Sequence, residues 1–196
     1  MDLISDLDEA IIASLKQIQG AQFAYVQSDE CSILLTDFEK PTSDAWFDGN
    51  IQKISSISSS VLSAEFNRLR IKRAGLDIQM AFFDSRVFTI PDPIEVYNYF
   101  IWRWKDCSRN SVSMVAQSLY PHKALQGKST SALQEMIFQK GINWATYDES
   151  LKNGRFIIKE TYLKEGATRS RWVAMPAWKL SADPTKLKAM IPAYAP

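Results

Sequence analysis

The chain has 196 residues, of which 46% are hydrophobic and 12% aromatic, and its formal net charge is +1 at pH 7. Such a composition provides for one substantial hydrophobic core and excludes an intrinsically disordered chain. No run approaches the roughly 18 apolar residues of a membrane span, and the acidic start does not resemble a signal peptide. We therefore expect a soluble, cytoplasmic protein that does not enter a membrane.

Charge and cysteine content narrow the function classes further. Basic residues gather at 68–73, with Arg169 and Arg171 nearer the end, so a nucleic-acid partner is compatible with the charge but not required by it. Cys31 and Cys107 lie far apart, and His122 is the single histidine. No Cys/His zinc site can be built from this set, and two reduced, mostly buried thiols are the favoured interpretation.

The first half of the chain alternates helical and strand patterns. Residues 3–18 have apolar positions at helical spacing, with Gly20 as a stop signal. Residues 23–26 and 32–35 predict a β-hairpin around the polar turn 27–30. A second helix is expected over about 44–69. Its many serines are unusual in a helix, and either tight packing against the sheet or a ligand explains them.

The second half continues with a strand, two helices and a hairpin. Residues 78–90 predict a strand buried on both faces, and Asp92 with Pro93 predicts a helix start that runs to about Leu119. A short helix should open at Ser131 and end at Gly141. Residues 156–162 and 171–174 are expected to pair, and the tail from residue 175 to be irregular. The order favours an α+β fold with a largely antiparallel sheet.

The best chemical candidate from residue types alone is the acidic turn Asp29-Glu30. Adjacent carboxylates repel unless a cation or a base neutralises them, and hard oxygen ligands suit Mg²⁺. A solvated acidic turn is the commoner explanation of such a pair. Ser28 and Lys53 suit phosphate contacts, although neither spacing matches a P-loop. Motifs of serine hydrolases and zinc proteases are absent.

Six further features of the sequence form an ordered set between about residue 20 and residue 172. They are Gln27-Ser28-Asp29-Glu30 with Ser32, Phe83-Asp84-Ser85-Arg86-Val87, Asn98 to Arg103 followed by Asp106, Arg109, Asn110 and Ser111, His122-Lys123, Leu125 to Lys128, and Glu135 to Trp144. In their order, these segments resemble the tRNA-His guanylyltransferase family, and most of all its bacterial and phage guanylyltransferase-like members.

The resemblance implies a polymerase palm-like (ferredoxin-like) antiparallel sheet with helices, and a C-terminal helix and β-hairpin extension. Residues 1–120 would form the palm-like nucleotidyltransferase domain, and residues 121–196 an extension packing on the same core. Family members activate an RNA 5′ end with ATP or GTP and then add a guanylate, or another nucleotide, in the 3′-to-5′ direction. The expected partners are tRNA and nucleoside triphosphates, in a homo-oligomer.

Site residues follow from the same resemblance. Asp29 and Glu30 would be catalytic as ligands of Mg²⁺, because two metal ions suit phosphoryl transfer. Ser28, Lys53 and Arg86 would contact the nucleotide. Triphosphate or the RNA end would be held by Arg103, Arg109, Asn110 and Lys128. For Arg103 and Asp106 alone, an i,i+3 surface pair is the simpler explanation.

One departure from the family pattern affects the expected activity. Family members begin with a strand carrying an Asp-Gly motif whose aspartate bridges two metals, and this chain begins at the following helix. Asp48-Gly49 falls inside the second predicted helix and does not replace that motif. The first palm strand is thus expected to be missing. Three explanations stay open: a start at an internal methionine, a partner chain that supplies the strand, and a catalytically inactive relative acting as an RNA- or protein-binding module.

Overall fold

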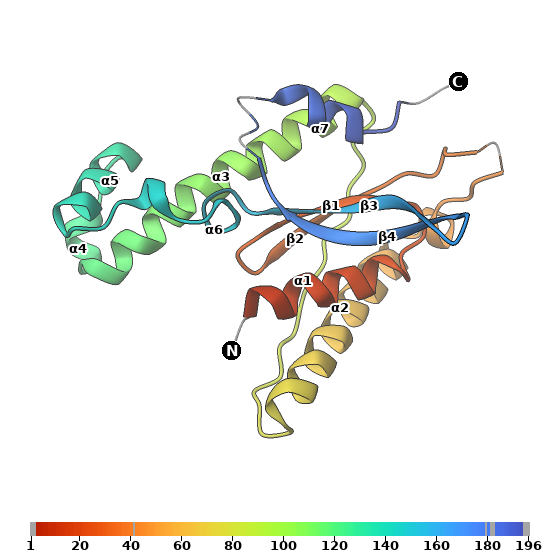
Figure 1. Cartoon of the computed structure of the whole chain (residues 1–196), viewed down its shortest axis with the longest axis horizontal. Coiled ribbons are helices and arrows are strands. Elements are labelled where there is room, and N and C mark those ends of the chain that lie inside the picture. The colour runs from red at the N-terminus through yellow and green to blue at the C-terminus, as the bar shows by residue number, and fades with distance from the viewer. Residues whose placement is uncertain (1–2, 41, 179, 181–182, 194–196) are drawn as a thin grey trace.

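A computed structural model describes residues 3–40, 42–178, 180 and 183–193. Its centre is one antiparallel sheet of four strands in the order β2-β1-β3-β4 (Figure 1). The strands are β1 (Ala21–Gln27), β2 (Glu30–Leu35), β3 (Arg155–Lys164) and β4 (Ala167–Pro176). Helices flank this sheet, and the fold is the predicted α+β class with an antiparallel palm-like sheet.

Two tight hairpins build the sheet, and both were predicted from the sequence. The β1–β2 turn consists of Ser28 and Asp29, with φ of 47° at Ser28. The β3–β4 turn consists of Glu165 and Gly166, and both have positive φ. Two-residue hairpin turns favour positive φ because it matches the twist of the paired strands. The strands extend beyond the apolar runs of the sequence, because backbone pairing continues at neighbouring polar residues. The hairpins meet where β1 pairs with β3.

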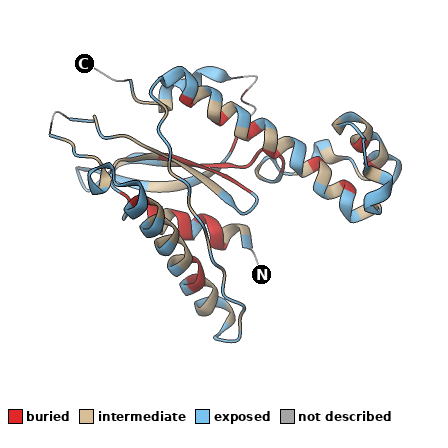
Figure 2. Cartoon of the chain, turned by 180° about the vertical axis from the view of Figure 1, so that it is seen from behind, coloured by how far each residue is buried: buried red, intermediate tan, exposed pale blue. Residues whose placement is uncertain are grey.

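Helices cover both faces of the sheet. Helices α1 (Leu3–Leu15) and α2 (Ile51–Ala74) lie on one face, and α3 (Pro93–Leu119) and α7 (Pro184–Met190) lie on the other (Figures 1 and 2). The central strand β1 is buried on both faces, since successive side chains alternate. Its side chains at 23 and 25 join the core cluster with α3, and those at 24 and 26 join the cluster with α1 and α2.

The distal half of α3 extends beyond the sheet and carries a helical lobe. This lobe comprises α4 (His122–Leu125), α5 (Thr130–Gln139), the 3-10 turn η2 (Trp144–Thr146) and α6 (Glu149–Asn153) (Figure 1). A separate small core joins it to α3 through Val112, Ala116, Leu133 and Ile137. The start of α3 agrees with prediction, because Asp92 caps it at the nitrogen of Ile94. Helix α5 begins at Thr130, earlier than predicted, because Ser129 and not Ser131 caps it.

The predicted bounds of the second helix were wrong at both ends. Helix α2 begins at Ile51 because the Asn50 side chain accepts a hydrogen bond from the backbone nitrogen of Lys53 (3.1 Å). The helix continues to Ala74. Before it, the 3-10 turn η1 (Trp46–Gly49) has positive φ at Phe47 and Asp48, so Asp48-Gly49 lies in a turn and not inside a helix.

The predicted strand at 78–90 was also wrong in two respects. Residues 79–90 are extended but pair with no strand that the structure describes, and from residue 80 to 88 exposed and half-buried side chains alternate instead of being buried on both faces. Side chains of α2 hydrogen-bond the segment's backbone. Asn67 bonds the nitrogen and oxygen of Ala81 (2.9 and 2.7 Å), Ser63 accepts from Phe83 N (3.0 Å), and Ser55 donates to Ser85 O (2.7 Å). Two of the unusual serines of α2, Ser55 and Ser63, are thereby explained by hydrogen bonds to this segment.

The tail was predicted to be irregular from residue 175, which is wrong for two stretches. Met175 and Pro176 complete β4, and Pro184 opens helix α7, since proline suits the first turn of a helix. Leu187 of α7 is fully buried in the cluster with α3. Residues 194–196 lie outside the described part of the chain. Among the helices of that part, none is long and apolar enough to cross a membrane.

Candidate functional site

The tip of the β1–β2 hairpin lies between two hollows of the surface. Ser28 and Asp29 are exposed, and Asp29 lines both hollows. Within the described residues, the Asp29 carboxylate makes no hydrogen bond or ion pair. It is therefore available to a cation, and it is set on a turn that two paired strands hold in place.

Glu30, in contrast, is already neutralised. Its carboxylate forms an ion pair with the Arg103 guanidinium and accepts a hydrogen bond from Gln27 Nε2 (3.2 Å). The Arg103 side chain is 13% exposed, and its guanidinium lies over the Trp102 ring at 5.0 Å from the centroid. Two of the sequence-predicted site residues, 73 positions apart, are thus in direct contact.

Asp106 connects the candidate residues of α3. Its carboxylate lies 3.7 Å from Arg103, forms an ion pair with Arg109, and accepts a hydrogen bond from Asn110 Nδ2 (3.1 Å). The pair of Arg103 and Asp106 does form, but within a larger network that fixes three polar side chains. Asp106 was not among the predicted site residues. Its i,i+3 and i,i+4 spacing was the available signal.

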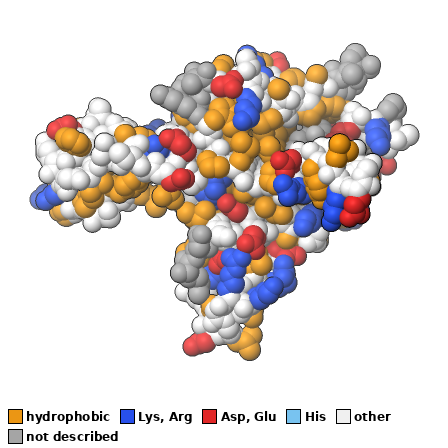
Figure 3. Space-filling view, viewed as in Figure 1, with side chains coloured by type: hydrophobic (Ala, Val, Ile, Leu, Met, Phe, Trp, Pro, Cys, Tyr) orange, Lys and Arg blue, Asp and Glu red, His pale blue; other side chains and the backbone are white. Residues whose placement is uncertain are grey.

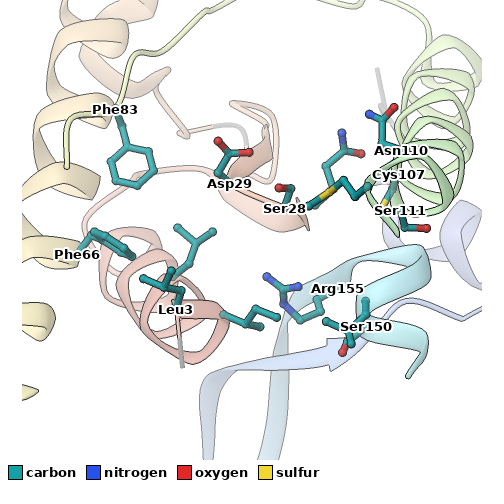
Figure 4. A pocket seen from close by; sticks show the side chains of 15 residues that line it. Leu3, Ser28, Asp29, Phe66, Phe83, Cys107, Asn110, Ser111, Ser150 and Arg155 are labelled. Carbon is teal, nitrogen blue, oxygen red and sulfur yellow. The ribbon is translucent and has the colours of Figure 1, made fainter. Parts of the chain in front are cut away.

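The first hollow, of about 380 Å³, is mainly apolar. Figure 4 shows Phe66 and Phe83 at one end, Cys107, Asn110 and Ser111 of α3 at the other, and Ser28 and Asp29 between them. Apolar walls with a few polar groups at the margin are typical of sites that bind small molecules.

Arg155 also lines the first hollow, and sequence reasoning missed it. Its Nε donates to both Asp8 carboxylate oxygens (2.8 and 2.7 Å), and both residues are buried. This ion pair ties α1 to β3. Gly154, the residue before Arg155, has a φ of 76°. A Cβ at this position would lie 2.5 Å from the Val26 carbonyl oxygen, so only glycine fits there. No signal in the sequence joins residues 147 positions apart.

The second hollow, of about 500 Å³, collects most of the predicted charges. Asp29, Glu30, Arg86 and Arg103 all line it. The Arg86 side chain is 88% exposed, and its guanidinium lies 3.5 Å from the Asp84 carboxylate. The same hollow thus contains two guanidinium groups that can bind an anion and two carboxylates that can bind a cation.

Two predicted residues lie apart from this group. Lys53 is exposed in the first turn of α2 and lines neither hollow. Lys128 is exposed in the lobe, between α4 and α5. On the face seen in Figure 3, basic and acidic side chains are interspersed over the sheet and α2, so that face has no field of a single sign.

The cysteines are thiols at neutral pH. Burial raises the pKa of Cys31 to about 12, and it also raises the pKa of Cys107. Both are free, with Cys107 buried and Cys31 half-buried. Reactive cysteines need a lowered pKa, so neither fits a nucleophile.

The sequence and the structure both match known proteins. The sequence model of the tRNAHis guanylyltransferase (Thg1) family matches residues 2–91. A bacterial tRNA(His) guanylyltransferase-like protein solved in complex with ATP is 37% identical, with a TM-score of 0.86 over 97% of this chain and 80% of that one. A bacterial protein of the same description, in complex with GTP, is 35% identical, with a TM-score of 0.81 over 97% and 78%.

Two more distant relatives were also found. The tRNA(His) guanylyltransferase of Saccharomyces cerevisiae has a TM-score of 0.65 over 92% of this chain and 78% of that one. It is 20% identical, so it shows a shared fold alone. An uncharacterised protein of Acanthamoeba polyphaga mimivirus is 27% identical over 202 residues, which cover 89% of this chain and 69% of the viral protein.

Proposed function

Because this chain belongs to the tRNA-His guanylyltransferase family, we propose that it adds a guanylate, or another nucleotide, to the 5′ end of a tRNA in the 3′-to-5′ direction. The observation that carries the proposal is the second hollow, where Asp29 and Glu30 lie beside Arg86 and Arg103. GTP and ATP are the proposed substrates, in line with the nucleotides bound to the two bacterial relatives.

Mg²⁺ is the proposed metal, and the residues present fit it. Mg²⁺ is usually held by one or two carboxylates together with substrate phosphates and water, which is the donor set that this turn offers. Asp29 is the first ligand on this proposal, since its carboxylate is unengaged within the described residues. Glu30 is the second, after exchange of its contact with Arg103. When bound, the metal would orient the attacking oxygen and neutralise developing charge.

The arginines and Ser28 are proposed to hold the triphosphate. Arg103 is already oriented by the Trp102 ring and by Asp106, so little side-chain freedom is lost when it meets a phosphate. Arg86, which is mostly exposed, would close over the anion from the opposite wall. Ser28 offers its hydroxyl at the hairpin tip. Lys53 as a further nucleotide contact rests on the family resemblance alone.

Contacts with RNA are proposed along α3 and the lobe. Arg109 and Asn110 lie about two helical turns beyond Arg103 on α3 and are joined to it through Asp106, and Lys128 lies farther out on the lobe. A tRNA that lies along α3 would meet these groups in sequence from its 5′ end outward. Phosphate contacts of this kind position the RNA without reading its sequence.

Binding of GTP tests the metal assignment. We expect Mg²⁺-dependent binding, measured by isothermal titration calorimetry, that weakens at least about tenfold in Asp29→Ala because the metal bridges carboxylate and phosphate. Asp77→Ala removes another exposed aspartate, from the loop after α2, and should bind like the parent chain. Equal binding by the parent chain and Asp29→Ala would remove the metal role. RNA binding without nucleotide turnover would indicate instead an inactive relative that serves as a binding module.

A further inference from the structure

Arg103 is held from three sides beside the hairpin tip. Its guanidinium forms an ion pair with Glu30, lies 3.7 Å from the Asp106 carboxylate, and lies over the Trp102 ring at 5.0 Å from the centroid. The Arg103 side chain is 13% exposed, whereas the Glu30 side chain is 60% exposed. A change of partner at this ion pair therefore involves movement of Glu30 more than of Arg103.

The Glu30 carboxylate is held through a single oxygen. Glu30 Oε2 accepts from both the Arg103 guanidinium and Gln27 Nε2, the latter at 3.2 Å. Glu30 Oε1 makes no hydrogen bond within the described residues. Ion pairs with an exposed partner are weak, because water competes for both charges. Separation of Glu30 from Arg103 thus has a small cost.

The two ligands proposed for this site compete with the ion pair. A divalent cation at Asp29 gains a second carboxylate only if Glu30 leaves Arg103. A triphosphate gains the full fork of guanidinium donors only if Arg103 leaves Glu30. The ion pair therefore opposes the cation when it binds alone, and it opposes the triphosphate when that binds alone.

Together, the two ligands leave no charge of the pair without a partner. With the ion pair open, Asp29 and Glu30 face the cation and Arg103 faces phosphate. Its contacts with Asp106 and Trp102 keep Arg103 in place during the exchange, because neither contact involves Glu30. By thermodynamic linkage, each ligand must then raise the affinity of the site for the other by the same factor.

We propose that the Glu30–Arg103 ion pair couples cation binding to triphosphate binding, so that the empty site discriminates against free cations and metal-free triphosphates and favours the metal–nucleotide complex. This role rests on the proposed function, in which Asp29 and Glu30 bind a divalent cation and Arg103 binds phosphate. Arg103 is thereby a positioning residue for the carboxylate before it is a contact for the nucleotide.

Binding of Mn²⁺ without nucleotide tests the coupling. Mn²⁺ is the probe because it takes the same oxygen ligands as Mg²⁺ and its free fraction is measured by electron paramagnetic resonance. Arg103→Met should bind Mn²⁺ about two- to fivefold more tightly than the parent chain, since Glu30 is released. In the presence of Mn²⁺, the same variant should bind GTP at least about tenfold more weakly, because the guanidinium is lost. A purely structural role of Arg103 would weaken both.

A double-mutant cycle separates the exchange of Glu30 from the general field of a positive charge. In the Glu30→Gln background, Arg103→Met should leave the affinity for Mn²⁺ unchanged. Lys105→Met removes a charge from an exposed position two residues farther along α3, and it should bind Mn²⁺ like the parent chain. Arg103→Gln is a second neutral replacement that should reproduce Arg103→Met, and circular dichroism checks that each variant is folded.

An affinity for Mn²⁺ that is unchanged or lower in both folded Arg103 variants would overturn the coupling. Equal tightening in the parent and Glu30→Gln backgrounds would also overturn it, because Arg103 would then act through its charge alone. Asp29→Ala distinguishes this failure from failure of the proposed function. Loss of Mn²⁺ binding in Asp29→Ala leaves the metal assignment intact, whereas equal binding by Asp29→Ala and the parent chain removes both the metal site and the coupling.

Discussion

Strand β1 and residues 79–90 are similar in sequence character but differ in structure. Both are apolar stretches that adopt an extended backbone. Strand β1 is buried on both faces and pairs on both edges, with β2 and β3. Residues 79–90 bury one face and have one edge hydrogen-bonded, by side chains of α2. The difference shows that local sequence determines extension, whereas the ladder depends on which elements lie alongside.

The largest expected effect comes from a substitution in the core around β1. Phe156 of β3 is fully buried, stacked on Trp178 with 4.8 Å between ring centroids and packed against Tyr25. Phe156→Ala should lower the free energy of unfolding by about 3–5 kcal/mol, measured by urea denaturation, because it leaves a cavity. Phe82→Ala, at an exposed phenylalanine of the extended segment, should change it by less than about 0.5 kcal/mol. Equal losses would show that the two regions are packed alike.

An intermediate effect is expected where α2 holds the extended segment. Asn67 is buried and bonds both backbone groups of Ala81. Asn67→Ala should cost about 1–3 kcal/mol and speed exchange of the Ala81 amide, since both backbone groups lose their partner. Ser60→Ala removes an exposed serine that bonds only Ser56 O of its own helix, and it should leave both quantities unchanged. Unchanged protection of Ala81 in Asn67→Ala would contradict the role given to α2.

The smallest expected effect concerns Cys31 of β2, at the border between the two regions. Burial raises its pKa from 9.0 to about 12, so the folded chain keeps a proton that the unfolded chain releases above pH 9. Its contribution to stability is complete below pH 9 and is lost as the pH rises toward 12. Cys31→Ala should therefore lose less stability than the parent chain between pH 9 and pH 10.5. If urea denaturation shows the same loss of stability in both proteins over this pH range, the Cys31 thiol is exposed to solvent and its pKa is not raised.

The sequence predicted the elements whose signals are local. Asp92 with Pro93 marks the start of α3, and polar turns between apolar runs mark both hairpins. The start of α2 was misplaced because the side chain of Asn50 decides it. Residues 78–90 were expected to be buried on both faces because their apolar content is that of a central strand. Which faces are covered depends on α2 and on the sheet, which periodicity does not specify.

Four of the predicted site residues lie together in the structure, but their contacts were not predictable from the sequence. Asp29, Glu30, Arg86 and Arg103 were identified through family motifs, and the fold brings them to one hollow. That Glu30 is engaged by Arg103 depends on the packing of α3 against the hairpin, across 73 positions of sequence. Arg155 was missed for the same reason, since its partner Asp8 is 147 positions away. The roles of all the predicted site residues, Lys53 and Lys128 included, stay predictions.

Transfer of labelled guanylate to a tRNA is the most direct test of the proposed function. The chain is incubated with Mg²⁺, ATP, labelled GTP and a tRNA-His transcript, and the RNA is resolved by denaturing electrophoresis. We predict one labelled product extended at its 5′ end, which disappears in Asp29→Ala and persists in Asp77→Ala. Labelling that is equal in the parent chain and Asp29→Ala, or GTP binding without any labelled RNA, would contradict the account.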